Sequence, residues 1–150
     1  MRTIPYDDKY QSVFKKLNLE WLDAYHLTEA RDLEVLDNPQ ETILSKGGFL
    51  LLAESDGEIV GSAALMKEHE GVYELAKMAV SPAHQGKGIS KLLLDECLQE
   101  AKIRGAKKIV LFSNHKLTKA LALYEKYGFQ YVPFEDSPFT TADIKMELLL

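Results

Sequence analysis

A glycine-containing loop between a predicted strand and a predicted helix constrains this chain more than any other feature. The strand covers residues 72–80 and stops at Ser81-Pro82, and the helix begins near residue 89. Free backbone N–H groups and the helix dipole favour an anion at such a junction, although the glycines could also form a simple turn. The loop reads Gln85-Gly86-Lys87-Gly88-Ile89-Ser90.

Two nucleotide-binding motifs do not fit this loop. A Walker loop needs a glycine five residues before Gly86 and a Ser or Thr after the lysine, but the chain has Ser81 and Gly88 there. A dinucleotide fingerprint that starts at Gly86 needs Gly or Ala near position 91, where Lys91 stands. The sequence therefore disfavours a nucleotide-binding switch, while Lys87 and Lys91 still favour a phosphate group.

The remaining segments indicate an α/β chain. Residues 7–36 should be helical because their apolar residues recur at steps of three and four, and Asp56-Gly57 is typical of a two-residue hairpin turn. The predicted order is helices, three strands, helix, strand, helix and two strands. The predicted strands cover residues 49–54, 58–66, 72–80, 108–113, 129–134 and 144–148, and the later helices cover 89–104 and 117–127.

The N-terminal quarter should carry a buried apolar stripe and a charged face. The predicted stripe consists of Val13, Leu17, Trp21, Leu22 and Tyr25. The acidic residues of the opposite face should be solvated, unless some of them steer a cationic partner. These acidic residues are Glu20, Asp23, Glu29, Asp32 and Asp37.

Length, charge and residue counts indicate one domain and disfavour a membrane span, nucleic-acid binding, a disulfide and a metal site. A chain of 150 residues matches one domain, residues 1–150, and it contains no apolar run near the roughly 18 residues of a membrane span. The N-terminus has no signal-like apolar segment, so a cytoplasmic location and no membrane contact are expected. A net charge of −5 disfavours nucleic acid, yet residues 61–132 hold 11 Lys and Arg against 7 Asp and Glu, which allows a local anion site. Cys97 cannot form an internal disulfide, and four scattered histidines imply no metal.

The chain from about Phe49 to its C-terminus resembles the Gcn5-related N-acetyltransferase (GNAT) family. The loop is similar to that family's Q/R-x-x-G-x-G/A signature, residues 74–82 look like its fourth strand, and Ala120 with residues 123–129 looks like its later helix-to-strand motif. Ser90 departs from the usual Gly or Ala, and Leu117 stands where many members have Asn. The resemblance implies a central, mostly antiparallel mixed sheet with helices on both faces.

The resemblance also implies a function. It implies acetyl-CoA as cosubstrate, no metal, and direct attack by a primary amine of a small molecule or polypeptide; a homodimer is one option. A non-catalytic acyl-CoA-binding regulatory module is the alternative. Asn114 could replace the missing Asn at Leu117. Residues 78–80 should offer backbone N–H groups to the thioester carbonyl and the pantetheine arm, because the fourth strand splays from the fifth in this family. The implied cofactor-binding residues are Met78, Ala79, Val80, Gln85, Gly86, Lys87, Gly88, Ile89, Ser90, Lys91, Asn114 and Tyr124.

Two residues carry the predicted chemistry. Glu74 is a lone acid in a mostly apolar strand, and the resemblance makes it a general base, direct or through water; a solvent-facing strand glutamate is the alternative. The resemblance places Tyr124 near the sulfur as the acid for the thiolate, whereas its helical pattern alone indicates a core aromatic. A covalent route is disfavoured because Cys97 lies mid-helix and no serine occupies a nucleophile elbow.

Overall fold

Seven strands form one sheet with β4 at its centre. The computed structural model describes residues 1–135, 137 and 139–150. The strands follow the spatial order β1-β2-β3-β4-β5-β7-β6, and all neighbours are antiparallel except β4 and β5, which confirms the predicted mixed sheet. The strands are β1 (Arg2–Pro5), β2 (Phe49–Ser55), β3 (Glu58–His69), β4 (Val72–Val80), β5 (Lys108–Ser113), β6 (Gln130–Val132) and β7 (Ile144–Leu149).

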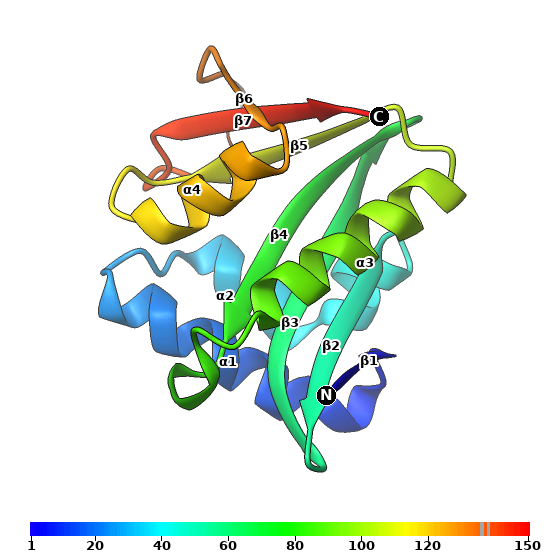
Figure 1. The fold of residues 1–150 in the computed structure, drawn as a ribbon, viewed down its shortest axis with the longest axis vertical. Helices are drawn as coiled ribbons and strands as arrows, with labels where there is room; N and C mark the ends of the chain where they lie inside the picture. The colour runs from blue at the N-terminus through cyan, green and yellow to red at the C-terminus, as the bar shows by residue number, and fades with distance from the viewer. Residues whose placement is uncertain (136, 138) are drawn as a thin grey trace.

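Helices cover both faces of the sheet, as predicted (Figure 1). On one face α3 and α4 pack over a core that contains Leu93, Leu111 and Met146, and on the other face α1 and α2 pack with Phe14 and Leu36. None of the helices in the described part of the chain has the length and apolar character needed to cross a bilayer. The helices are η1 (Asp8–Tyr10), α1 (Gln11–Ala24), α2 (Ala30–Asp37), the π-helix η2 (Gln40–Leu44), η3 (Pro82–His84), α3 (Ile89–Ile103) and α4 (Thr118–Lys126).

The N-terminal quarter differs from the sequence prediction. Arg2–Pro5 forms an unpredicted edge strand, because pairing with β2 stabilises a short segment that has no alternating pattern of its own. Tyr25 lies just beyond the last residue of α1 and is exposed, so it does not belong to the buried stripe. Asp32 was expected on a solvated face but is buried, because Lys77 of β4 pairs with its carboxylate.

Strand β4 contains a bulge at Lys77. Between the pairs Ser62–Ala79 and Ala64–Ala76, β4 has two residues, Lys77 and Met78, where β3 has one. Lys77 has a φ of 51°, in the left-handed region that costs a residue with a side chain roughly 1–2 kcal/mol. Backbone strain of this kind concentrates at functional sites, so the bulge marks β4 as the strand to inspect.

Candidate active site

The candidate site begins where β4 and β5 separate. The two strands pair only from Val72–Lys108 to Glu74–Val110. Beyond Glu74 the two strands diverge, and Figure 1 shows the opening widening toward the left of the view. In the described strands, the backbone groups of β4 along this opening have no partner on β5, so they are available to a ligand.

The glycine loop follows β4 directly and leaves free space in front of α3. Gly86 has a φ of 78° and Gly88, the residue before α3, has a φ of 81°. A Cβ atom at either glycine would meet no other atom within 4 Å. Within the described residues no side chain caps α3, so the N–H groups of its first turn can bind an anion, with the exposed Lys87 and Lys91 beside them.

The other predicted loop residues have mainly structural positions. Ile89 is buried and anchors the start of α3 in the core, whereas Ser90 is half-buried. The side-chain amide of Gln85 lies 3.4 Å from the carbonyl oxygen of Val80, which ties the loop back to the end of β4. The predicted sequence of strand, loop and helix is therefore confirmed, and the contacts of these residues with a cofactor stay a prediction.

Tyr124 lies on α4 with its hydroxyl group beside β4. Its ring is 8% exposed and packs 5.7 Å from the ring of Phe129, measured between centroids, while its hydroxyl lies 4.0 Å from Sδ of Met78. Burial, together with the nearby Cys97 thiol, raises the pKa of Tyr124 to about 12. The residue fills the core, as its helical pattern indicates, and it also keeps a proton next to the opening between β4 and β5 at neutral pH.

Glu74 lies at the point where the two strands separate. It is 3% exposed, so the alternative of a solvent-facing strand glutamate is wrong, and its role as a general base stays a prediction. Burial raises the pKa of Glu74 to about 8; a hydrogen bond with Glu68 and the charge of Glu68 also raise it, while Lys77 and Arg31 oppose the shift. A carboxyl group with a pKa near neutrality is suited to proton transfer.

Glu74 and Tyr124 lie on opposite faces of the sheet. The neighbours of Glu74 in the strand, Tyr73 and Leu75, belong to the core under α3 and α4, which also contains Tyr124. Because side chains alternate along a strand, Glu74 faces α1 and α2 instead. The two predicted catalytic residues therefore reach a common ligand only through the opening between β4 and β5.

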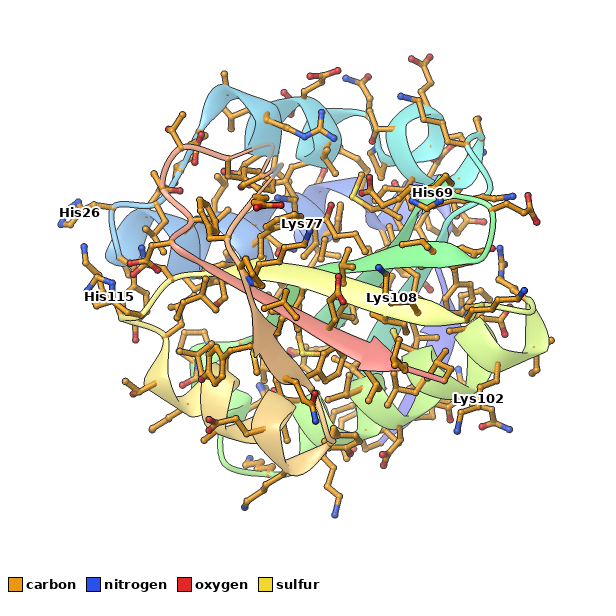
Figure 2. All side chains as sticks on the ribbon, turned by 90° about the horizontal axis from the view of Figure 1, so that it is seen from above. His26, His69, Lys77, Lys102, Lys108 and His115 are labelled. Atoms are coloured by element: carbon orange, nitrogen blue, oxygen red, sulfur yellow. The ribbon has the colours of Figure 1, made fainter. Side chains whose placement is uncertain are left out.

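A buried ion pair connects the bulge of β4 to α2. Nζ of Lys77 pairs with Oδ1 of Asp32, and the two side chains are only 5% and 4% exposed. The other carboxylate oxygen of Asp32 accepts the backbone N–H of Glu29 at 2.8 Å, and the Lys77 ammonium lies 5.1 Å from the centroid of the Phe139 ring. Figure 2 shows Lys77 in the interior of the molecule, whereas His26 and His115 lie at its edge.

We expect this pair to be important for stability. Removing one partner of a buried ion pair leaves a desolvated charge and destabilises a protein by about 3–5 kcal/mol, so Asp32→Ala should lower the free energy of unfolding by that amount in urea titrations. Asp37→Ala is the matched control, because its ion pair with Lys15 is about half exposed and should contribute no more than about 1 kcal/mol. Equal losses for the two variants would contradict a special role for the buried pair.

Glu29 clamps the segment before β7 onto the start of α2. Its carboxylate accepts four hydrogen bonds, from the backbone N–H and the hydroxyl of both Thr140 and Thr141, at 2.5–3.1 Å. Burial raises the pKa of Glu29, but the hydrogen bonds from Thr141 and Thr140 outweigh it, so the net shift is downward. Nδ2 of Asn114 donates to the carbonyl oxygen of Thr141 at 2.8 Å, and its contact with a cofactor stays a prediction.

Sequence reasoning missed several of these residues. Lys77 had a signal, because Glu74 and Lys77 are the two charged residues of an otherwise apolar predicted strand. No local sequence signal marks Asp32, Glu29 or Glu68, because each is an ordinary acidic residue until tertiary contacts give it a partner.

The histidines are scattered, as expected. His26, His69 and His115 are exposed and His84 is half-buried. Among the described residues, no group of three or more His, Cys, Asp or Glu side chains is arranged to hold a metal ion. The expectation that the protein needs no metal stays a prediction.

Comparison with protein families and curated proteins gives one consistent result. Residues 10–129 match the sequence profile of the acetyltransferase (GNAT) family. The uncharacterized N-acetyltransferase YjgM of Escherichia coli K12 is 32% identical over 102 residues, which are 66% of this chain and 61% of that protein. The chain thus spans about three fifths of the length of this curated relative.

Solved structures share the fold over nearly the whole chain. A GNAT-family acetyltransferase from Staphylococcus aureus Mu50 superposes with a TM-score of 0.88 at 22% identity, covering 97% of this chain and 96% of that one. The putative acetyltransferase yncA from Salmonella typhimurium, solved with its cofactor acetyl-CoA, gives a TM-score of 0.75 at 19% identity, with 99% and 93% coverage. These similarities confirm the fold that the loop and the strand order indicated.

Proposed function

Because the chain belongs to the acetyltransferase (GNAT) family, we propose that it transfers the acetyl group of acetyl-CoA to a primary amine of a small molecule or polypeptide. The amine attacks directly while both substrates are bound. The observation that carries this proposal is the opening between β4 and β5, which has the glycine loop after it and Glu74 and Tyr124 on its two sides. The relative solved with acetyl-CoA supports the choice of acyl donor.

The residues that follow β4 fit the anionic part of acetyl-CoA. The uncapped first turn of α3, the open space at Gly86 and Gly88, and two exposed lysines provide the dipole, the close approach and the charge that a pyrophosphate needs. The edge of β4 from Met78 to Val80 offers backbone groups to an extended chain. When bound, acetyl-CoA supplies the acetyl group and a thiolate leaving group.

Glu74 and Tyr124 each move one proton in the reaction. Glu74 accepts a proton from the protonated amine, directly or through water, and the neutral nitrogen then forms its bond to the acetyl carbon while the carbon–sulfur bond breaks. The nitrogen releases its second proton to solvent as the amide forms. Tyr124 gives its proton to the departing sulfur and regains one from solvent. Burial, followed by the charges of Glu96 and Glu100, raises the pKa of Cys97 to about 12, so this thiol is a poor nucleophile, which supports direct attack.

A single glycine substitution tests the cofactor site. Gly88→Ala should weaken coenzyme A binding in calorimetry, because the new methyl group occupies the open space in front of α3. Part of any effect comes from backbone strain, since φ is 81°. Gly57→Ala is the control: this hairpin glycine has a φ of 83° and equally open space, but it lies in the turn between β2 and β3. If the two variants bind coenzyme A equally well, the loop assignment is wrong.

Turnover tests the proposed function itself. The protein is incubated with acetyl-CoA and a panel of amines, and free coenzyme A thiol is measured with and without each amine. Amine-dependent thiol release, with an acetylated amine as the second product, supports the enzyme. Binding of acetyl-CoA without release for any amine in the panel would instead favour the non-catalytic acyl-CoA-binding module.

A further inference from the structure

A chain of buried polar groups lies beneath the bulge of β4. Asn18 of α1 and Ser62 of β3 are both fully buried. Nδ2 of Asn18 donates to the carbonyl oxygen of Phe14 at 3.0 Å and to Oγ of Ser62 at 3.1 Å. Oγ of Ser62 in turn donates to the carbonyl oxygen of Lys77 at 2.7 Å. Because Ser62 accepts a hydrogen bond from Asn18, its own proton is directed toward Lys77.

This hydrogen bond determines the direction of the next N–H group. In a trans peptide the carbonyl of one residue and the N–H of the next point in opposite directions. The carbonyl of Lys77 points toward Ser62 on β3, so the N–H of Met78 points away from β3. The opening between β4 and β5 lies on that side of β4, because the registered pairs between these two strands end at Glu74.

The side chain of Lys77 holds the same peptide from a second direction. Its ammonium group is fixed by the buried Asp32, which the N-terminus of α2 holds in place through the backbone N–H of Glu29. A residue at a φ of 51° keeps that conformation only when its surroundings determine it. Ser62 at the carbonyl and Asp32 at the ammonium are contacts of this kind, and the Phe139 ring lies beside the ammonium as well.

The family resemblance assigns backbone N–H groups of Met78 to Val80 to the thioester carbonyl, and we propose that Ser62 and Asn18 are the positioning residues that aim the N–H of Met78 at this oxygen in bound acetyl-CoA. This inference rests on the proposed function. Neither side chain touches the substrate, because both act through the peptide between Lys77 and Met78. A fixed donor of this kind stabilises the negative charge that develops on the carbonyl oxygen, and it needs no reorganisation during the reaction.

Ser62→Ala is the direct test. It should reduce kcat by about 10- to 10²-fold, because a donor displaced by about 1 Å loses much of its effect while the remaining site is intact. Affinity for coenzyme A should stay unchanged, since the glycine loop is untouched. The infrared stretch of an isotope-labelled acetyl carbonyl, measured on bound acetyl-CoA without an amine, should move toward the value of a carbonyl without a donor.

Two further variants separate positioning from general stability. Asn18→Leu should give the same change in kcat and in the carbonyl stretch, because Ser62 loses the partner that orients its proton. Thr42→Ala removes a similar hydroxyl bond, 2.7 Å to the carbonyl of Asn38 in the π-helix region, and should change neither. Wild-type kcat and an unchanged carbonyl stretch in Ser62→Ala would overturn the inference.

A measurement on the wild-type protein tests the inference without depending on whether any variant folds. Its bound acetyl carbonyl should absorb at a lower wavenumber than a thioester without a hydrogen-bond donor, and the absence of that shift also overturns the inference. Failure of the wild-type protein to bind acetyl-CoA or to acetylate any amine is a different result, because it contradicts the proposed function.

Discussion

Tyr124→Phe should slow acetyl transfer by about 10²- to 10⁴-fold, the range for loss of a positioned general acid. Phe keeps the ring and its packing against Phe129, so the free energy of unfolding should change by less than about 1.5 kcal/mol. The rate has to be measured in single turnovers at saturating acetyl-CoA, after a thiol burst has shown that chemistry and not product release limits it.

Tyr127→Phe is the matched control for this prediction. Tyr127 follows the last residue of α4, and its hydroxyl bonds to Asp95 and to the carbonyl oxygen of Lys91. Its removal should therefore lower stability but leave the single-turnover rate close to that of the wild type. A wild-type rate in Tyr124→Phe would leave Tyr124 as a core residue, and water or the amine itself would then have to protonate the sulfur.

Glu74→Gln should lower the transfer rate at neutral pH by about 10²- to 10⁴-fold, because the variant keeps the size of the side chain but cannot accept a proton. Affinity for coenzyme A should remain normal. Since the pKa of Glu74 is about 8, the wild-type rate should rise as the pH increases toward that value and the carboxyl group ionises. At a pH near 10, where much of an alkylamine is already neutral, the variant should approach the wild type.

Glu68→Gln tests the cause of the raised pKa. Glu68 raises the pKa of Glu74, so its replacement should lower that pKa and move the midpoint of the rate profile to lower pH. A rate defect in Glu74→Gln that stays constant across the pH range would show that Glu74 orients the amine and does not take its proton.

The free energy of unfolding should decrease as the pH rises, whereas the transfer rate should increase. The folded state holds a proton on Glu74 between its ordinary pKa near 4.5 and the raised value near 8, so the wild-type protein should lose stability as the pH rises through this window. Glu74→Gln should show less of this loss in urea titrations at pH 5 and pH 8.

Local patterns were enough to predict most of the sheet and the cofactor loop. Asp56-Gly57 adopts φ angles of 51° and 83°, the left-handed pair that its sequence predicts for a two-residue hairpin. The strand, glycine loop and helix around Gly88 were predictable for the same reason, since each element is short and carries its own signal. The edge strand Arg2–Pro5 was not predictable, because only its pairing with β2 stabilises it.

The candidate site was predictable only in part, because the pKa and the partners of a charged residue depend on its burial in the folded chain. Glu74 was identified from its isolation in an apolar strand, but its raised pKa depends on Glu68, which is close only after β3 and β4 pair. Asp32 is 45 residues away from its partner Lys77, so nothing in the local sequence of either residue predicts the ion pair. Ser62 and Asn18 likewise become hydrogen-bonded partners only when α1 packs on β3.

The bulge at Lys77 also changes which residues of β4 face each side of the sheet. Before it, odd-numbered residues such as Tyr73 and Leu75 face α3 and α4; after it, the even-numbered Met78 and Val80 pack against the same core. Glu74 and Met78 are four residues apart and would share a face in a regular strand, but the extra residue of the bulge places them on opposite faces. Deleting Lys77 would remove the bulge and its buried ammonium group, while Met78 to Val80 would keep their faces, because the residues after Ala76 would then alternate regularly. The bulge therefore adds the buried Lys77 to the side of the sheet that carries Glu74 and leaves Met78 on the side that carries Tyr124.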